Sequence, residues 1–207
     1  MSHSLLAIHP QDPQPRLIER AVEVVRRGGL IAYPTDSSYA LGCHIGDKEA
    51  MERIARLRQV DAKHNFTLVC RDLSEIASFA KLDDWAYRMI KNHVPGPYTF
   101  ILPATREVPR RLQNPKRRTI GIRVPEHRVV QALLAALDEP LMSSTLLMPG
   151  DEWPLSDPEE IAERLAHQVD LVIDSGPCGV EPTTVVEFDG SAMRVVRRGR
   201  GDPTAFE

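Results

Sequence analysis

The segment 29–36, GLIAYPTD, constrains the fold most, because it joins the end of a helix to a short apolar strand and then to a polar loop. Apolar residues repeat at helical spacing over 17–25, and a glycine pair ends that helix. The strand 30–33 runs into a proline, and Thr35 and Asp36 follow it. In α/β proteins ligands bind outside the carboxyl ends of strands, so we expect a binding site at this loop.

Helix-like and strand-like segments alternate along the rest of the chain. Asp47 is the expected N-cap of one helix, Asp72 and Glu75 form a capping box for the next, and residues 156–159 predict the start of another. Helices are expected to begin at about residues 15, 47, 72, 83, 129 and 156. The expected strands are 30–33, 66–70, 98–102, 119–124, 141–145, 169–173, 184–188 and 193–196.

Several of these strands follow one another directly, which favours a mixed sheet over a purely parallel one. A chain of 207 residues is long enough for one substantial core. We therefore predict a single α/β domain over residues 1–207, with a core at about 16–199 and peripheral termini. The motifs GxGxxG and GxxxxGK[ST] are absent, so the usual nucleotide fingerprints do not apply.

Composition excludes several classes of protein. Three cysteines without a CxxC pair suggest neither a disulfide framework nor a zinc site, and the seven histidines form no HExxH motif. No apolar stretch approaches the roughly 20 residues that cross a bilayer, so we expect a cytoplasmic protein with no membrane partner. The net charge of −3 hides a basic run at 106–118.

Three arginines, at two places in the chain, could bind an anion. Arg56 and Arg58 lie at an expected helix end, where guanidinium groups suit a carboxylate or a phosphate but also complement the helix dipole in solvent. Arg123 lies in an apolar strand on the same face as Gly121 and Thr119. Because a buried guanidinium is costly without an anion, Arg123 faces either a ligand or a structural ion pair.

Hydroxyl groups gather at two strand ends. Ser143, Ser144 and Thr145 form one cluster, and Thr183 and Thr184 form a second near the C-terminus. Such clusters can face a ligand, although they are also common where loops begin. A further cation, at position 197, ends the last expected strand.

The basic run supplies cations that could position phosphates, but it contains no aromatic side chain on which a base could stack. It is either a solvated loop or an RNA-binding surface. The candidate RNA-binding residues are Arg110, Arg111, Lys116, Arg117 and Arg118.

Six segments together resemble the YrdC-like family, and within it the YciO branch. In chain order they are GGLIAYPTDSSYALGC, RIARLRQ, PGPYTFIL, TIGIRVPEH, PLMSST and PTTVVEF, which span about residues 16–199 with the closing arginine. The resemblance implies a twisted mixed sheet, flanked by helices, around a large positively lined cavity. It also implies an ATP-dependent nucleotidyltransferase that makes threonylcarbamoyl-adenylate from L-threonine and bicarbonate, releases pyrophosphate, and serves the modification of tRNA adenosine together with other proteins.

The same resemblance implies roles for individual residues and a cofactor. Magnesium would accompany ATP. Substrate contacts are implied for Thr35, Arg56, Arg58, Arg123 and Ser143. Nucleotide contacts are implied for Thr119, Thr145, Thr184 (or its neighbour Thr183) and Arg197.

Two departures from the synthase branch leave alternatives open. Arg56 replaces the lysine of a KxR motif, and Leu147 replaces the asparagine of an SxN motif; the lysine expected in the following loop is also displaced, with His64 nearby. The chain could thus be a weak synthase. It could instead be a non-catalytic protein that binds double-stranded RNA or a nucleotide, or a carbamoyl or adenylyl transferase with another acceptor.

Overall fold

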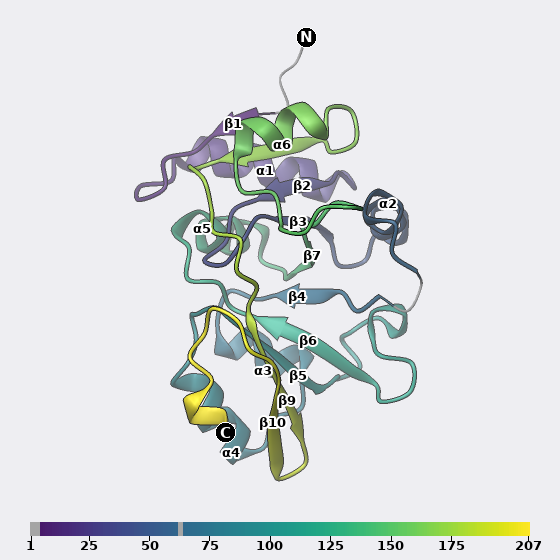
Figure 1. Cartoon of the computed structure of the whole chain (residues 1–207), viewed down its shortest axis with the longest axis vertical. Coiled ribbons are helices and arrows are strands. Elements are labelled where there is room, and N and C mark those ends of the chain that lie inside the picture. Colours follow the sequence, from purple (N-terminus) through teal and green to yellow (C-terminus); the bar gives the residue numbers. More distant parts are fainter. Residues whose placement is uncertain (1–4, 62–63) are drawn as a thin grey trace.

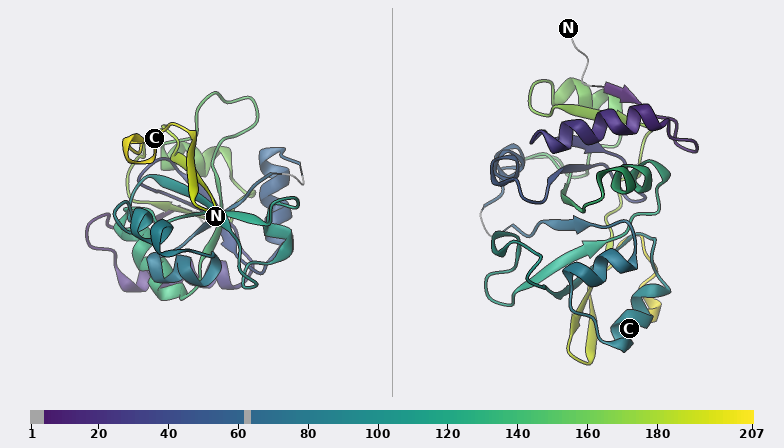
Figure 2. Two further views of the ribbon diagram at one scale, coloured as in Figure 1. Left: turned by 90° about the horizontal axis from the view of Figure 1, so that it is seen from below. Right: turned by 180° about the vertical axis from the view of Figure 1, so that it is seen from behind.

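A strongly twisted sheet of ten strands organises the molecule in this computed structural model, which describes residues 5–61 and 64–207. The strands are β1 (Leu5–Ala7), β2 (Ile31–Tyr33), β3 (Ala40–His44), β4 (Thr67–Val69), β5 (Tyr98–Pro103), β6 (Thr119–Arg123), β7 (Leu141–Thr145), β8 (Leu171–Asp174), β9 (Thr184–Asp189) and β10 (Ala192–Arg197). Viewed from below, they fan out around the long axis of the molecule (Figure 2).

The strand order is β1-β8-β2-β3-β7-β4-β6-β5-β9-β10. The sheet contains parallel pairs such as β4 with β6 and antiparallel pairs such as β3 with β7, so the predicted mixed α/β fold is confirmed. Two strands, β1 and β3, were not predicted. The first pairs in parallel with β8, and the second lies between β2 and β7 (Figure 1).

Six α-helices accompany the sheet in the described part of the chain: α1 (Pro15–Arg26), α2 (Lys48–Arg58), α3 (Leu73–Phe79), α4 (Asp84–Lys91), α5 (Arg128–Leu137) and α6 (Pro158–Arg164). Two short 3-10 helices, η1 (Arg110–Leu112) and η2 (Thr204–Phe206), are also present. The apolar stripes of α1 and α5 pack together against one face of the sheet, over β2, β7 and β8. Buried residues of α2, α3, α4 and α6 join the core on the opposite face. None of the described helices is long and apolar enough to cross a bilayer.

Local signals set most helix starts. The carboxylate of Asp47 accepts a hydrogen bond from the backbone N–H of Ala50 at 2.9 Å, as an N-cap should. Asp72 accepts from the N–H of Glu75, but Glu75 reaches back to the N–H of residue 71 rather than to the cap itself. The last helix is capped by Asp157, not by Ser156 as its capping pattern suggested.

Candidate functional site

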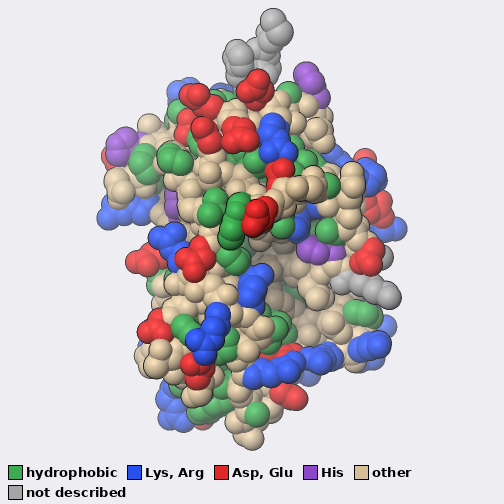
Figure 3. Space-filling model, in the orientation of Figure 1, with side chains coloured by type: hydrophobic (Ala, Val, Ile, Leu, Met, Phe, Trp, Pro, Cys, Tyr) green, Lys and Arg blue, Asp and Glu red, His purple; other side chains and the backbone are tan. Residues whose placement is uncertain are grey.

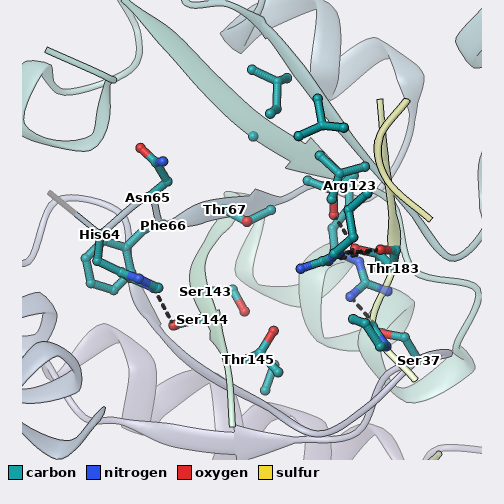
Figure 4. Close-up of a pocket in the computed structure, with 18 of the residues that line it drawn as sticks. Ser37, His64, Asn65, Phe66, Thr67, Arg123, Ser143, Ser144, Thr145 and Thr183 are labelled. Carbon is teal, nitrogen blue, oxygen red and sulfur yellow. Dashed lines mark hydrogen bonds between the residues drawn. The ribbon is translucent and has the colours of Figure 1, made fainter. Parts of the chain in front are cut away.

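A cavity of about 600 Å³ opens on the same face of the sheet as α1 and α5, over the part of that face that these helices leave free. Leu141 and Val69 pack beneath those helices, and Ser143 and Thr67, two residues away and therefore on the same face of the same strands, line the cavity. On the neighbouring strands, Gly121 of β6, Thr99 of β5 and Val185 of β9 continue this lining. One face of the central sheet is thus the floor of the cavity (Figure 4).

Hydroxyl groups and one glycine make up much of this floor. Thr67, Thr99, Thr119 and Ser143 line it together with Gly121. A Cβ atom at position 121 would lie 3.3 Å from Cγ2 of Thr99, so the glycine leaves room above the middle of the sheet. The floor therefore offers many donors and acceptors to a polar ligand.

A buried phenol beside Ser143 holds this side chain in place. The hydroxyl of Tyr33 lies 2.6 Å from Oγ of Ser143, which also donates to the carbonyl of Leu41 at 3.1 Å. Burial raises the pKa of Tyr33 to about 12, so the phenol keeps its proton. The hydroxyl of Ser143 donates its proton in the hydrogen bond to Leu41 and accepts one from Tyr33. Its remaining lone pair is therefore what it offers to the cavity, as an acceptor.

Arg58, the last residue of α2, forms one wall of the cavity. Its Nε donates to the carbonyl of Leu147 at 3.2 Å, and its Nη1 donates to Oγ of Ser144 at 2.5 Å and to Nε2 of His64 at 3.0 Å. Burial lowers the pKa of this guanidinium. The contact with Leu147 uses the backbone, so the apolar side chain at that position adds no hydrogen bond.

Arg197, at the end of β10, forms the opposite wall. Its Nη2 donates to the carbonyl and the hydroxyl of Thr183, at 2.9 Å and 3.2 Å. Thr183 in turn lies 2.8 Å from the hydroxyl of Thr99. Desolvation, and then the charge of Arg123, lowers the pKa of Arg197. Figure 4 shows Thr183 across the floor from Ser144 and His64.

Arg123 faces the cavity but is bound to an acid. Its Nη2 pairs with Oδ1 of Asp36, and its Nη1 donates to Oγ of Ser37 at 3.1 Å. Of the two environments that the sequence allowed for this arginine, the structure shows the ion pair. Thr35 supports the same loop: its hydroxyl donates to the carbonyl of Ser38 at 2.6 Å and accepts two backbone N–H groups.

Glu187 joins two further arginines at the cavity edge. It pairs with Arg117 of the loop between β5 and β6, and with Nη2 of Arg194 at 2.6 Å. Burial alone would raise the pKa of Glu187, but the hydrogen bonds from Arg194 and Arg117 hold it below its ordinary value. Among the described residues that line the cavity, Arg58 and Arg197 are the arginines that form no ion pair with a carboxylate.

The mouth of the cavity is partly apolar. Trp153, which is 57% exposed, lies on its rim with Pro154, Val180 and Val196. Figure 3 shows the hollow in the middle of the front face, with Lys and Arg side chains along its edges. The cavity therefore combines a polar floor, cationic walls and an apolar rim.

Several sequence-predicted residues lie in this cavity and others do not. Arg58, Thr119, Arg123, Ser143, Thr145, Thr183 and Arg197 line it. Arg56 is exposed and outside the lining, and Thr35 is buried outside it, in the loop that contributes Ser37 and Ser38. Thr184 lies outside the lining: its fully buried hydroxyl faces the opposite side of β9, where it donates to the carbonyl of Gly201 at 2.5 Å.

The candidate RNA-binding residues do not form one free surface. Arg117 pairs with Glu187 at the cavity, and Nη2 of Arg111 donates to the carbonyl of Gly46 at 2.7 Å. Arg110, Lys116 and Arg118 are exposed on the same loop.

Sequence reasoning missed Asp36 as the partner of Arg123, and Glu187, Thr67, Thr99 and His64 as cavity residues. A signal existed only for Glu187, because a lone carboxylate in an apolar strand requires a partner, just as Arg123 does.

Within residues 5–61 and 64–207, no group of three or more His, Cys, Asp or Glu side chains could hold a metal ion. A metal that accompanies a nucleotide would therefore have to be bound mainly by phosphate oxygens.

Comparisons with known proteins agree on one family. The family model Sua5_yciO_yrdC, described as "Telomere recombination", matches residues 23–199. The uncharacterized protein YciO of Escherichia coli is 57% identical over 199 residues, which are 96% of this chain and 97% of that protein. The crystal structure of E. coli YciO matches with a TM-score of 0.94 and 56% identity over 100% of both chains. The crystal structure of P. abyssi Sua5 complexed with L-threonine has a TM-score of 0.85 and 24% identity, over 94% of this chain and 57% of that one.

Proposed function

The chain belongs to the Sua5/YciO/YrdC family, whose members include threonylcarbamoyl-AMP synthases, and we propose that it is itself such a nucleotidyltransferase. The proposed reaction joins L-threonine, bicarbonate and ATP to give threonylcarbamoyl-adenylate and pyrophosphate. Its product would serve tRNA modification by other proteins. The structure of P. abyssi Sua5 with L-threonine supports the choice of amino acid.

One observation carries the proposal: two arginines without a carboxylate partner, Arg58 and Arg197, face each other across a hydroxyl-lined floor. An amino acid and a nucleotide bring two separate anionic groups, a carboxylate and the phosphates, and guanidinium groups bind both. Arg123 is already paired with Asp36, so its charge is largely neutralised.

For this reaction the protein mainly has to position the reactants and neutralise their charge. The carbamate oxygen must reach the α-phosphorus in line with the departing pyrophosphate, and cationic walls stabilise the charge that develops there. Magnesium would be held by the triphosphate, consistent with the lack of a metal-binding cluster in the described residues.

The test is pyrophosphate release with ATP-magnesium, bicarbonate and L-threonine, preceded by calorimetric titration of ATP-magnesium with and without L-threonine. Arg58→Ala and Arg197→Ala should each weaken binding and release about tenfold or more. Arg56→Ala and Arg198→Ala are matched controls, because both residues are exposed neighbours outside the cavity. Release that does not depend on L-threonine would contradict the proposal.

Leu147 favours a second candidate, a carbamoyl or adenylyl transfer to another acceptor at the same site. Its side chain lines the cavity but supplies no hydrogen bond to a phosphate or a sugar. A screen of amino acids and other amines in the same assay separates the two functions. Turnover restricted to L-threonine would remove this candidate.

Double-stranded RNA binding is a third candidate, favoured by the exposed cations of the loop between β5 and β6. Titration with duplex RNA at several salt concentrations tests it, since each phosphate contact adds to the salt slope. Replacing Arg110, Lys116 and Arg118 with glutamate should abolish the binding. Unchanged binding would reject this surface.

A further inference from the structure

His64 and Ser144 face each other in the wall of the cavity that Arg58 forms (Figure 4). Nε2 of His64 lies 3.1 Å from Oγ of Ser144, and Nη1 of Arg58 donates to both atoms. The imidazole ring packs edge-on against Phe66, with centroids 5.2 Å apart. Ser144 is fixed by strand pairing opposite Leu41. Ser144 is thus positioned by strand β7, and His64, in the loop before β4, by its contacts with Phe66 and Arg58.

The contacts require a neutral imidazole with its lone pair on Nε2. A guanidinium can only donate, so the nitrogen that faces Arg58 must accept. Burial, and then the positive charge of Arg58, lowers the pKa of His64 below its ordinary value, while Asp61 acts in the opposite direction. Among the residues that the structure describes, Arg58 from α2 and Asp61 from the loop after it are the charged groups that act on this ring. His64 is therefore available as a base at neutral pH.

Other ionisable side chains of the described lining are poorer proton acceptors. The arginines remain protonated. Glu187 is bound by Arg117 and Arg194, which keep its pKa low. Glu152 is exposed on the rim, away from the floor. His64 is the one neutral imidazole among the described lining residues, and a hydroxyl connects it to the cavity.

We propose that Ser144 and His64 form the proton-accepting pair for an α-amino acid whose amine reacts in this cavity. Ser144 is the catalytic residue that touches the amine, and His64 acts behind it as the base. This role rests on the proposed function, because it concerns the first step of the same reaction.

In that step an ammonium and bicarbonate give a carbamate, one water and one proton. The N–C bond forms, a C–O bond of bicarbonate breaks, and its oxygen leaves as water. One amine proton passes to Oγ of Ser144 while the hydroxyl proton passes to Nε2 of His64, which at that moment releases its hydrogen bond from Nη1 of Arg58. A second amine proton joins the departing oxygen to form the water. The charge of Arg58 disfavours the imidazolium that results, so the proton is then released and the pair is reset.

The experiment measures pyrophosphate release by the intact chain, with ATP-magnesium, bicarbonate and L-threonine, across about pH 5 to pH 9. For the wild type, the rate should fall as pH drops through the pKa of His64. His64→Gln and Ser144→Ala should lower kcat by about 100-fold or more and remove this acid limb. The KM for L-threonine should change less than about threefold, because binding groups remain in place.

Rescue and control variants separate catalysis from folding. Ser144→Thr keeps the hydroxyl and should keep most of the activity. Added imidazole should restore activity to His64→Ala. His167→Gln is the matched control, since that histidine is exposed and outside the cavity.

Two results would overturn the role of the pair while leaving the proposed function intact. One is a His64→Gln variant with the wild-type kcat. The other is a His64→Gln or Ser144→Ala variant that loses activity but still shows the fall in rate at low pH, which indicates a structural effect. A wild-type chain that releases no pyrophosphate would overturn the proposed function and this role together.

Discussion

Removing the carboxylate of Asp36 should destabilise the whole fold. The side chains of Asp36 and Arg123 are only 11% and 10% exposed, and they pair across the loop after β2 and the end of β6. Oδ2 of Asp36 also accepts the backbone N–H of Glu126 at 2.9 Å. In an Asp36→Asn variant, the amide oxygen can still accept the backbone N–H of Glu126. The amide carries no charge, however, so the guanidinium of Arg123 is left without an anion.

The magnitude follows from that burial. Breaking a buried ion pair by removing one partner costs about 3–5 kcal/mol, because a desolvated charge is left uncompensated. A domain of this kind has a total stability of about 5–15 kcal/mol, so the loss is a large fraction of it. At about 2–4 °C per kcal/mol for a chain of this length, the melting temperature should fall by roughly 6–20 °C.

Urea unfolding monitored by circular dichroism measures the loss, with the slope checked for two-state behaviour. The double variant Asp36→Asn with Arg123→Met carries no buried charge and should recover about 2 kcal/mol or more of the stability lost. Glu19→Gln is the control, because the pair of Glu19 and Arg26 is about half exposed and should contribute less than about 1 kcal/mol. A loss below about 1 kcal/mol for Asp36→Asn would refute this reasoning.

Three further predictions concern packing and thiol chemistry. Gly121→Val should fill the cavity floor and weaken nucleotide binding about tenfold or more in calorimetry, with a stability change within about 1 kcal/mol; unchanged affinity would show that the ligand does not lie there. Gly201→Ala should cost about 1–3 kcal/mol in urea unfolding, because its Cβ would lie 2.5 Å from Cε1 of Tyr98. Burial raises the pKa of Cys43 to about 12 and that of Cys178 to about 11, so both thiols stay protonated at pH 8. Mass spectrometry should therefore find slow alkylation that accelerates as pH rises toward those values or on denaturation, and fast labelling of the native chain at pH 8 would contradict this.

Elements with complete local signals were predicted well from sequence. The strand expected at 141–145 is β7, Leu141–Thr145, and Asp47 caps α2 as expected. These signals are local because an N-cap or an apolar run depends on neighbours in the chain.

The missed strands depend on distant partners instead. The strand β3 contains Gly42, which weakens a strand pattern, yet a Cβ there would lie 2.8 Å from Cε1 of Tyr33. A three-residue strand such as β1 is stabilised by its pairing with β8, far away in the chain. Neither reason is visible in a local window.

The predicted site shows the same division. That Thr183 lines the cavity and Thr184 does not could have been inferred from the sequence, because Val186 and Phe188 share the apolar face of Thr184. His64 gave no comparable signal, since its partner Arg58 is brought to it by α2 and its partner Ser144 by β7. Whether Arg123 contacts a ligand or a carboxylate likewise depends on a distant segment, the loop after β2 that carries Asp36.

The order of strands in the sheet also affects how the chain can fold during synthesis. When the ribosome has released only residues up to about 140, β2 and β3 can pair, but β7 is missing between β3 and β4, and β8 is missing between β1 and β2. Until then the early strands keep edges with unpaired backbone N–H and C=O groups, which are sites for aggregation. A nascent chain of this protein should thus depend on rapid completion of its last third, or on chaperones that cover those edges until β7 and β8 arrive.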